Sequence, residues 1–519
     1  MSRQFARRKT LVSVIISCLI ASVLPLPASA DVSLARVFGS HMVLQRDIDL
    51  PVWGYADAGE QITVTLGNHQ AKTKANDLGQ WKLTLPPLPA PGPVTMTVTG
   101  KNCITLDDIL IGEVWLCSGQ SNMEWRVGQA ANSAQEIAQA KYPAIRLFEV
   151  RNTSSGLPVT DFPEPAGHYE TWRICSPETI GSGFSACAYF FGRQLHQKLN
   201  IPIGLIDTTW GGTRIEPWTP PVGFASVQAL ADIANDVQTK NNAYAKAVPP
   251  AINALKTYLQ NAQQSLDRNN PLISAPPGWP GHALNHQTAP TGLYNAMIHP
   301  LAPFAIRGAI WYQGESNCGE GMLYYEKMKA LIGGWRKVWN QGDFSFYFAQ
   351  LAPFKYNRGQ DLPDIWQAQL AALAIPNTGM AVTTDLVDNI KDIHPINKQD
   401  VGKRLALWAL AKDYGFSGLV YSGPLFKSMI VQGSTIRVHF DHVGPGLTTR
   451  DGKNPDYFEI AGPDKAFVKA HAKIDGDTIL VSCKTVSQPV AVRFGYHEEA
   501  MPNLVNKAGL PASPFYAEK

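Results

Sequence analysis

The stretch ILIGEVWLCSGQSNM, residues 109–123, decides the fold class of this chain. Its first half is a short apolar run typical of a buried strand, and a polar turn containing Ser121 follows it. Similar apolar runs recur at 203–206, 308–312, 344–351 and 380–384, with helical candidates between them at 186–199 and 324–339. This alternation of strand and helix predicts an α/β domain with a largely parallel sheet.

Polar segments follow four of these predicted strands. They are residues 118–123, 210–213, 313–317 and, after a short loop, 392–395. In open parallel sheets ligands bind beyond the carboxyl ends of the strands. We therefore expect the four segments to meet at one edge of the sheet and to form one site.

The residue types in these segments match the needs of acyl transfer. A serine hydroxyl becomes a good nucleophile when a base takes its proton, and histidine has the near-neutral pKa that this base requires. Ser121 and His394 are the candidates. The oxyanion of the intermediate needs hydrogen-bond donors, and losing one typically costs about 10²–10³ in rate. A backbone N–H in the pair Gly211-Gly212 and the side chain of Gln313 are suitable donors.

Each of these residues also fits a structural role. Ser121 and Glu124 match a helix capping box, Gly211-Gly212 matches a tight turn, and His394 before Pro395 matches a helix start. Gln313 and Glu315 match structural hydrogen-bonding groups. Four such segments at one sheet edge favour the catalytic interpretation.

The same motifs resemble those of the bacterial sialate O-acetylesterases of the SGNH hydrolase superfamily. The resemblance is carried by residues 112–115, 119–123, 210–218, 311–317 and 392–399, and also by 39–46 and 294–300. It implies a flavodoxin-like SGNH hydrolase domain with three α/β/α layers and accessory β-sandwich segments at both ends. It implies neither metal nor cofactor.

The resemblance also implies the catalytic roles. Ser121 would be the nucleophile and His394 the base. The oxyanion donors would be the Ser121 N–H, a glycine N–H (Gly212, with Gly211 as the alternative) and the Gln313 side chain.

The acidic partner of His394 departs from the family pattern. SGNH hydrolases usually carry an aspartate three residues before the histidine, and Lys391 occupies that place here. Asp392, two residues before His394, is the favoured partner. Asp385 at a strand end and a backbone carbonyl that holds the imidazole are the alternatives.

The candidate substrate-binding residues are Arg214, Trp210 and Glu315. Arg214 has the chemistry to pair with the carboxylate of an acidic sugar, or to bond Glu216 or Asp207 within the fold. Trp210, Trp218 and Trp311 could form a wall on which a sugar stacks. They fit the hydrophobic core equally well, because large aromatic side chains are mostly buried.

The predicted activity is hydrolysis of O-acetyl esters on sugars, similar to that of a sialate 9-O-acetylesterase, through an acyl-enzyme. One alternative is an esterase for acetylated xylan or another polysaccharide. Another is a non-catalytic carbohydrate-binding protein, which would need neither Ser121 nor His394.

The first thirty residues predict a secretory signal peptide. A basic stretch at 3–9, an apolar run at 11–26 and the small residues 28–30 favour cleavage after Ala30, and hence a periplasmic or secreted protein. An uncleaved anchor is the alternative, but the run is short for a full span. All four charged residues of the leader are basic, so the formal net charge falls from +3 to about −1 on cleavage. This balance predicts no nucleic-acid partner. No later segment is long and apolar enough to cross a bilayer, which predicts no membrane insertion of the mature chain.

The chain divides by composition into several segments. Residues 31–105 predict an N-terminal β-sandwich, 106–424 the catalytic domain, and 425–519 a C-terminal β segment that packs with the N-terminal β region. Residues 222–290 predict an insertion made of a helical hairpin and a Pro/Gly-rich coil. The six cysteines after residue 30 have no metal-ligand spacing, and a core of this size does not require disulfides.

Overall fold

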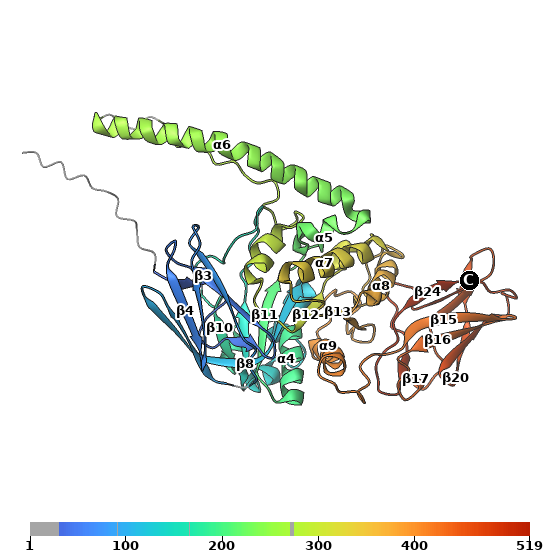
Figure 1. The fold of residues 1–519 in the computed structure, drawn as a ribbon. Helices are drawn as coiled ribbons and strands as arrows, with labels where there is room; N and C mark the ends of the chain where they lie inside the picture. The colour runs from blue at the N-terminus through green and yellow to red at the C-terminus, as the bar shows by residue number, and fades with distance from the viewer. Residues whose placement is uncertain (1–30, 91, 166, 270–273) are drawn as a thin grey trace, which may run out of the picture.

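The computed structural model describes residues 31–90, 92–165, 167–269 and 274–519 (Figure 1). The predicted leader and its cleavage site at Ala30 lie outside these residues. Within them, none of the helices combines the length and apolar character needed to cross a bilayer.

A parallel sheet forms the centre of the molecule. Its strands run in the order β10-β9-β11-β8-β12-β13-β14, and only the edge strand β10 is antiparallel to its neighbour. Both faces are covered, which is why the strands read as continuous apolar runs. The bounds are β8 Cys103–Gly119, β9 Tyr142–Glu149, β10 Trp172–Cys175, β11 Ile203–Thr209, β12 Gly308–Tyr312, β13 Ser345–Ala349 and β14 Thr378–Ala381.

Helices cover the two faces of this sheet (Figure 1). On one face α4 (Ala186–Leu199) packs against α9 (Lys398–Lys412), and on the other α7 (Leu323–Trp339) packs against α5 (Pro221–Ala225) and α8 (Asp361–Ala371). Short elements complete the domain: α1 Ser121–Glu124, α2 Ser133–Ala138, α3 Pro177–Gly181, η1 Val127–Gln129, η2 Glu216–Trp218, η3 Gln228–Leu230, η4 Tyr294–Ile298, η5 His299–Leu301, η6 Glu315–Asn317 and η7 Ala372–Ala374. The predicted three-layer α/β/α class is confirmed.

The N-terminal β segment is continuous with the catalytic sheet through β8. The first part of β8 alternates exposed and half-buried residues as part of the sandwich, and the second part is buried as the central strand. One sandwich sheet contains β1 Ser33–Leu34, β3 Leu50–Tyr55 and β6 Gln80–Leu85; the strands on the β8 side are β2 Val43–Gln45, β4 Gln61–Leu66, β5 His69–Lys74 and β7 Val94–Thr99. The two parts share one hydrophobic core.

The C-terminal β segment does not pack with the N-terminal one, so that expectation is wrong. The two segments lie at opposite ends of the molecule (Figure 1), and the C-terminal strands have a separate core, which contacts the catalytic domain through α8. Alternating apolar and polar residues show that one face of each strand is buried. They do not show which other element covers that face. The strands are β15 Leu425–Gln432, β16 Thr435–Asp441, β17 Leu447–Thr449, β18 Phe458–Ala461, β19 Phe467–Lys469, β20 His471–Asp475, β21 Thr478–Ser482, β22 Ala491–Phe494, β23 Leu504–Asn506 and β24 Phe515–Glu518.

The expected helical hairpin in 222–290 is also wrong. A single helix of 37 residues, α6 (Ala231–Asp267), projects from the body of the molecule and contains Pro249 and Pro250 (Figure 1). The φ of proline near −65° is compatible with a helix, and solvent can satisfy the carbonyls that lose a partner on this exposed arm. The Pro/Gly-rich stretch after it is irregular, as expected.

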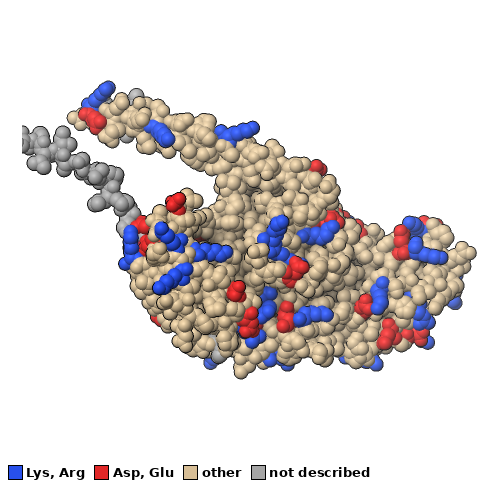
Figure 2. All heavy atoms as spheres, in the orientation of Figure 1, with Lys and Arg blue, Asp and Glu red and all other residues tan. Residues whose placement is uncertain are grey.

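Charged side chains of both signs are intermixed over the face shown in Figure 2. This agrees with the near-neutral balance of the chain after residue 30.

Candidate active site

The predicted polar segments meet beyond the carboxyl ends of β8, β11 and β12. The Gln120 N–H donates to the Tyr312 carbonyl (3.0 Å), and the Trp210 N–H donates to the Gly119 carbonyl (3.1 Å). These backbone bonds join the starts of the three loops. The fourth segment, around His394, approaches from the loop before α9.

Ser121 and His394 are in direct contact. His394 Nε2 lies 2.9 Å from Ser121 Oγ. The Trp125 ring stacks on the imidazole with centroids 4.7 Å apart and planes inclined by 19°. Ser121 is the first residue of α1, and Gln120 rather than Ser121 occupies the cap position. The hydroxyl is therefore free to interact with the imidazole.

The surroundings of His394 favour the neutral imidazole. Partial burial lowers its pKa below the ordinary value, and the positive charge of Lys398 lowers it further, while Asp392 acts in the opposite direction. At neutral pH the Nε2 is therefore able to accept the proton of Ser121.

Asp392 is the acid nearest to the imidazole, but its contact with the ring is long. Its Oδ1 accepts the backbone N–H of His394 at 2.9 Å and lies 3.5 Å from His394 Nδ1. The carboxylate side chain is 51 % exposed. Asp392 thus fixes the backbone of the loop and lies close enough to the ring for an electrostatic interaction.

Asp385 is not the acidic partner. Its two oxygens accept hydrogen bonds from Arg404 at 2.6 and 2.7 Å in a buried ion pair. Nor does a backbone carbonyl of the described residues accept a hydrogen bond from His394 Nδ1. Of the three alternatives, Asp392 alone agrees with the geometry.

Two backbone donors beside Ser121 have no acceptor within the described residues. They are the N–H groups of Ser121 and Gly212. The Gly211 N–H instead donates to Glu124 Oε2 at 2.7 Å, so Gly212 is the better donor of the pair. Gly212 has a φ of +72°, which favours glycine. A Cβ at Gly211 would lie 3.3 Å from the Ser121 Cβ, so this loop packs closely on Ser121.

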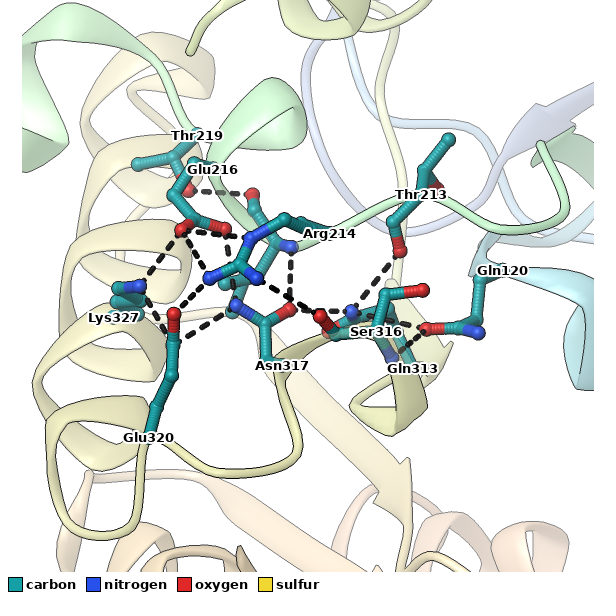
Figure 3. Close-up of polar contacts among 11 residues, drawn as sticks. Gln120, Thr213, Arg214, Glu216, Thr219, Gln313, Ser316, Asn317, Glu320 and Lys327 are labelled. Atoms are coloured by element: carbon teal, nitrogen blue, oxygen red, sulfur yellow. Dashed lines mark hydrogen bonds and ion pairs between the residues drawn. The ribbon is translucent and has the colours of Figure 1, made fainter. Parts of the chain in front are cut away.

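Gln313 does not present a free donor, contrary to the sequence prediction. Its Nε2 donates to Asn317 Oδ1 (2.8 Å), Gln120 Oε1 (3.1 Å) and the Thr213 carbonyl (3.2 Å) (Figure 3). Its Oε1 accepts from the Tyr324 hydroxyl at 2.9 Å, and the whole side chain is buried. Both amide hydrogens are therefore committed to the fold.

The neighbouring side chain of Gln120 has the free amide instead. Its Oε1 accepts from Gln313 Nε2 and from the backbone N–H groups of Gly314 (3.4 Å) and Ser316 (3.3 Å). In Figure 3 its nitrogen points away from this network. Within the described residues that nitrogen donates no hydrogen bond. It is also not completely buried. It is open to a ligand or water.

Arg214 is paired with carboxylates of the fold. Its guanidinium donates to Glu216 (3.1 Å), to the Ser316 carbonyl (3.0 Å) and to Glu320 (Figure 3). The buried Lys327 contacts the same two carboxylates at 2.7 and 2.6 Å. Of the alternatives predicted for Arg214, the bond to Glu216 is present. Together with the bonds to Ser316 and Glu320, it holds the loop after β12 in place.

Glu315 is likewise buried in the fold. Its Oε1 accepts a hydrogen bond from Asn122 Nδ2 at 2.6 Å, which removes it from the candidate sugar-binding surface. Trp218 and Trp311 belong to the core, whereas Trp210 is half-buried in the loop that carries Gly212. Trp210 stays a prediction as a sugar contact.

Two residues beside the catalytic pair were not predicted to have a role. Asn122 follows Ser121 and is buried, and it accepts a 2.5 Å hydrogen bond from the buried Lys398 Nζ. Both residues lie within the motifs that carry the resemblance. A signal for Lys398 was its place in the first turn of an apolar helix, where a lysine needs a buried partner.

The described residues hold no group of three or more His, Cys, Asp or Glu side chains that could bind a metal ion. Their cysteines are unpaired: Cys103, Cys117, Cys175, Cys187, Cys318 and Cys483.

The sequence and the fold both match known proteins. The sequence model of a family described as carbohydrate esterase, sialic acid-specific acetylesterase matches residues 111–263 and 277–411. The sialate O-acetylesterase of Rattus norvegicus is 32% identical over 431 residues, 76% of each chain. That of Homo sapiens is 31% identical over 446 residues, 78% of this chain and 76% of the relative. The crystal structure of a carbohydrate acetylesterase from Xanthomonas citri covers 94% of this chain and 100% of its own, with a TM-score of 0.79 and 34% identity.

Proposed function

Since the chain belongs to the family of sialic acid-specific acetylesterases, and is thus a carboxylic ester hydrolase of O-acetylated carbohydrates, we propose that it works through an acetyl-enzyme on Ser121. The observation that carries this proposal is the 2.9 Å contact between Ser121 Oγ and His394 Nε2. A non-catalytic binding protein would have no use for this pair.

The reaction has two balanced steps. His394 Nε2 takes the Ser121 proton while Oγ attacks the acetyl carbonyl carbon, and the imidazolium then protonates the sugar oxygen as the ester bond breaks. Water next attacks the acetyl group on Ser121, giving its proton to His394. Collapse of the second intermediate releases acetate and returns the proton to Ser121 Oγ.

The oxyanion of both intermediates would be bound by donors around Ser121. Among the described residues, the N–H groups of Ser121 and Gly212 have no acceptor. We assign the third donor to the Gln120 side chain, whose amide is free, in place of Gln313, whose amide is committed. Gln313 then acts by holding the Gln120 carbonyl.

Asp392 would orient the loop and stabilise the imidazolium. Its backbone bond to His394 fixes the position of the ring, and its negative charge favours the protonated ring. Because its side chain is half-exposed, water screens this second effect.

The proposed substrate is an O-acetylated sialic acid, of the 9-O-acetyl type. The names of the relatives, sialate O-acetylesterase, support the acetylated sialic acid, and the 9-O position is part of the proposal. Arg214, the residue considered for carboxylate recognition, is paired with two glutamates, and this favours keeping acetylated xylan or another polysaccharide as the second candidate. The acetyl ester alone needs to reach Ser121 for either reaction.

The test is acetate release by residues 31–519. Wild-type protein should release acetate from p-nitrophenyl acetate and from at least one member of a panel of acetylated sialic acids, acetylated xylan and other acetylated polysaccharides. Ser121→Ala should abolish all release. Full activity in Ser121→Ala would overturn the proposal, and the preferred panel member identifies the sugar.

We also propose that residues 1–30 direct export and are removed, which gives a periplasmic or secreted enzyme. The basic, apolar and small-residue segments of the leader support this. N-terminal sequencing of the exported protein should begin at Asp31. A retained Met1 would contradict it.

A further inference from the structure

A buried polar chain joins the two catalytic loops behind Ser121 and His394. The Asn122 side chain is its centre: Nδ2 donates to the Ile393 carbonyl at 3.0 Å and to Glu315 Oε1 at 2.6 Å, and Oδ1 accepts from Lys398 Nζ at 2.5 Å. Asn122 directly follows the nucleophile, and Ile393 directly precedes the base. One amide therefore links the backbone on both sides of the catalytic contact.

The network comes from separate parts of the fold. Asn122 belongs to the first turn of α1, Glu315 begins η6 after β12, and Lys398 begins α9. All three residues are buried. The positions of three elements are thereby tied to the loop that carries His394, which leaves the imidazole little freedom to move away from Ser121.

Burying the ammonium group of Lys398 costs desolvation free energy. Burial lowers its pKa to about 8, and within the part of the chain that the structure describes its ammonium donates one hydrogen bond, to Asn122, and also lies near two aromatic rings. Its Nζ lies 5.7 Å from the centroid of Trp125, the ring that stacks on His394, and 5.5 Å from that of Tyr312. Burying a charge without a full ion pair carries a desolvation penalty, so stability alone does not account for a lysine at this place.

The charge of Lys398 also acts on the base. The groups that act on the His394 pKa are Lys398, which lowers it, and Asp392, which raises it. Lys398 itself interacts with Glu315, Asp392, Asp388 and Cys187. A positive charge at this place opposes protonation of the imidazole and so keeps it ready to act as a base.

We propose that Asn122, Lys398 and Glu315 form a positioning unit that holds His394 against Ser121 and maintains it as the neutral base. This role rests on the proposed function of Ser121 and His394. None of the three is expected to touch the substrate. The unit acts in two ways. It fixes the orientation of the His394 imidazole, and the positive charge of Lys398 disfavours protonation of that ring.

The primary test is Lys398→Met, assayed for acetate release between pH 5 and 9. The variant should lose kcat by about 10- to 100-fold, as expected for a misplaced catalytic group, with KM little changed. The acid limb of kcat/KM should move to higher pH because the charge that disfavours the imidazolium is gone. Asp392→Asn should move the same limb to lower pH, since Asp392 acts in the opposite direction.

A matched control separates this role from simple loss of stability. Lys327 is also a buried lysine, paired with Glu216 and Glu320 away from His394. Lys327→Met should lower Tm but leave the acid limb where it is. If Lys398→Met does not fold, Asn122→Ala decides, because it breaks the links to Ile393 and Lys398 together and should lower kcat without a matching change in KM.

Wild-type kcat and an unmoved acid limb in folded Lys398→Met would overturn the positioning role. If Lys398→Met does not fold, wild-type kcat in folded Asn122→Ala would overturn the positioning role. Ser121→Ala in the same assay distinguishes the two proposals: if it is inactive while Lys398→Met keeps full activity, only the positioning role fails. Activity in Ser121→Ala would remove the proposed function itself.

Discussion

His394 Nε2 lies 2.9 Å from Ser121 Oγ, although 273 positions separate the two residues in the chain. The parallel sheet explains this contact. Ser121 lies two residues after the end of the central strand β8, and His394 lies in the loop before α9, which packs against β13 and β14. Strands that are distant in sequence thus deliver their loops to one edge.

Replacement of Asp392 should weaken catalysis moderately. Because its Oδ1 lies 3.5 Å from Nδ1 and the carboxylate is half-exposed, Asp392→Asn should lower kcat by about 10- to 100-fold, less than the roughly 10⁴-fold known for a buried, directly bonded aspartate. The measurement is kcat on p-nitrophenyl acetate.

Asp385→Asn is the matched comparison. It breaks the buried pair with Arg404 and should cost about 3–5 kcal/mol of stability, measured by denaturant unfolding, while the folded enzyme keeps its kcat. A larger loss of kcat in Asp385→Asn than in Asp392→Asn would reverse the assignment.

Removal of the Gln120 amide should impair the transition state. Gln120→Ala deletes the proposed third oxyanion donor, and kcat should fall by about 10²–10³. Tm should fall as well, because the buried Oε1 accepts hydrogen bonds from Gln313, Gly314 and Ser316. Gln313→Ala should lower both kcat and Tm, because it frees the Gln120 carbonyl and also breaks bonds to Asn317 and Thr213. Unchanged kcat in Gln120→Ala would show that its amide does not reach the oxyanion.

Arg214 should affect stability and not the choice between acidic and neutral sugars. Arg214→Gln loses the contacts with Glu216 and Glu320, so Tm should fall. The ratio of kcat/KM for an acetylated sialic acid to that for a neutral acetylated sugar should stay the same. A selective loss of activity on the sialic acid would instead indicate that Arg214 binds the carboxylate.

Asp207 should make stability depend on pH. Burial, and then the negative charge of Glu149, raise its pKa to about 7, against the opposing effects of Arg126 and Thr209. The unfolded value is about 3.9, so between these pH values the native state binds more protons than the unfolded state, and stability falls as pH rises.

Asp207→Asn cannot titrate and escapes this loss. The unfolding free energy of Asp207→Asn minus that of wild type should therefore increase from pH 5 to pH 8, measured by denaturant titration. A difference that stays constant over this range would contradict the raised pKa.

The sequence predicted the features that depend on local pattern. The alternation of apolar runs and helices gave the α/β class, and the loop motifs pointed to Ser121 and His394, which the fold brings into contact. It did not predict which way buried side chains point. The bond from Arg214 to Glu216 was among the predicted alternatives, but the contact of Arg214 with Glu320 was not. Nor was the network that holds the buried Gln313 amide against Gln120, Thr213 and Asn317.

The local sequence pattern also did not predict how distant elements are arranged in space. The prolines at 249–250 suggested a hairpin, yet both fit inside α6. The C-terminal strands have the same alternation as the N-terminal ones, but the choice of packing partner depends on shape complementarity with α8 and not on periodicity.

The most direct test of the central claim is covalent labelling of the nucleophile. A fluorophosphonate should modify wild-type protein once and stop acetate release, and peptide mass spectrometry should place the adduct on Ser121. His394→Ala should label far more slowly, because the base that activates Oγ is missing. An adduct on another residue, or full acetate release from protein modified on Ser121, would contradict the assignment.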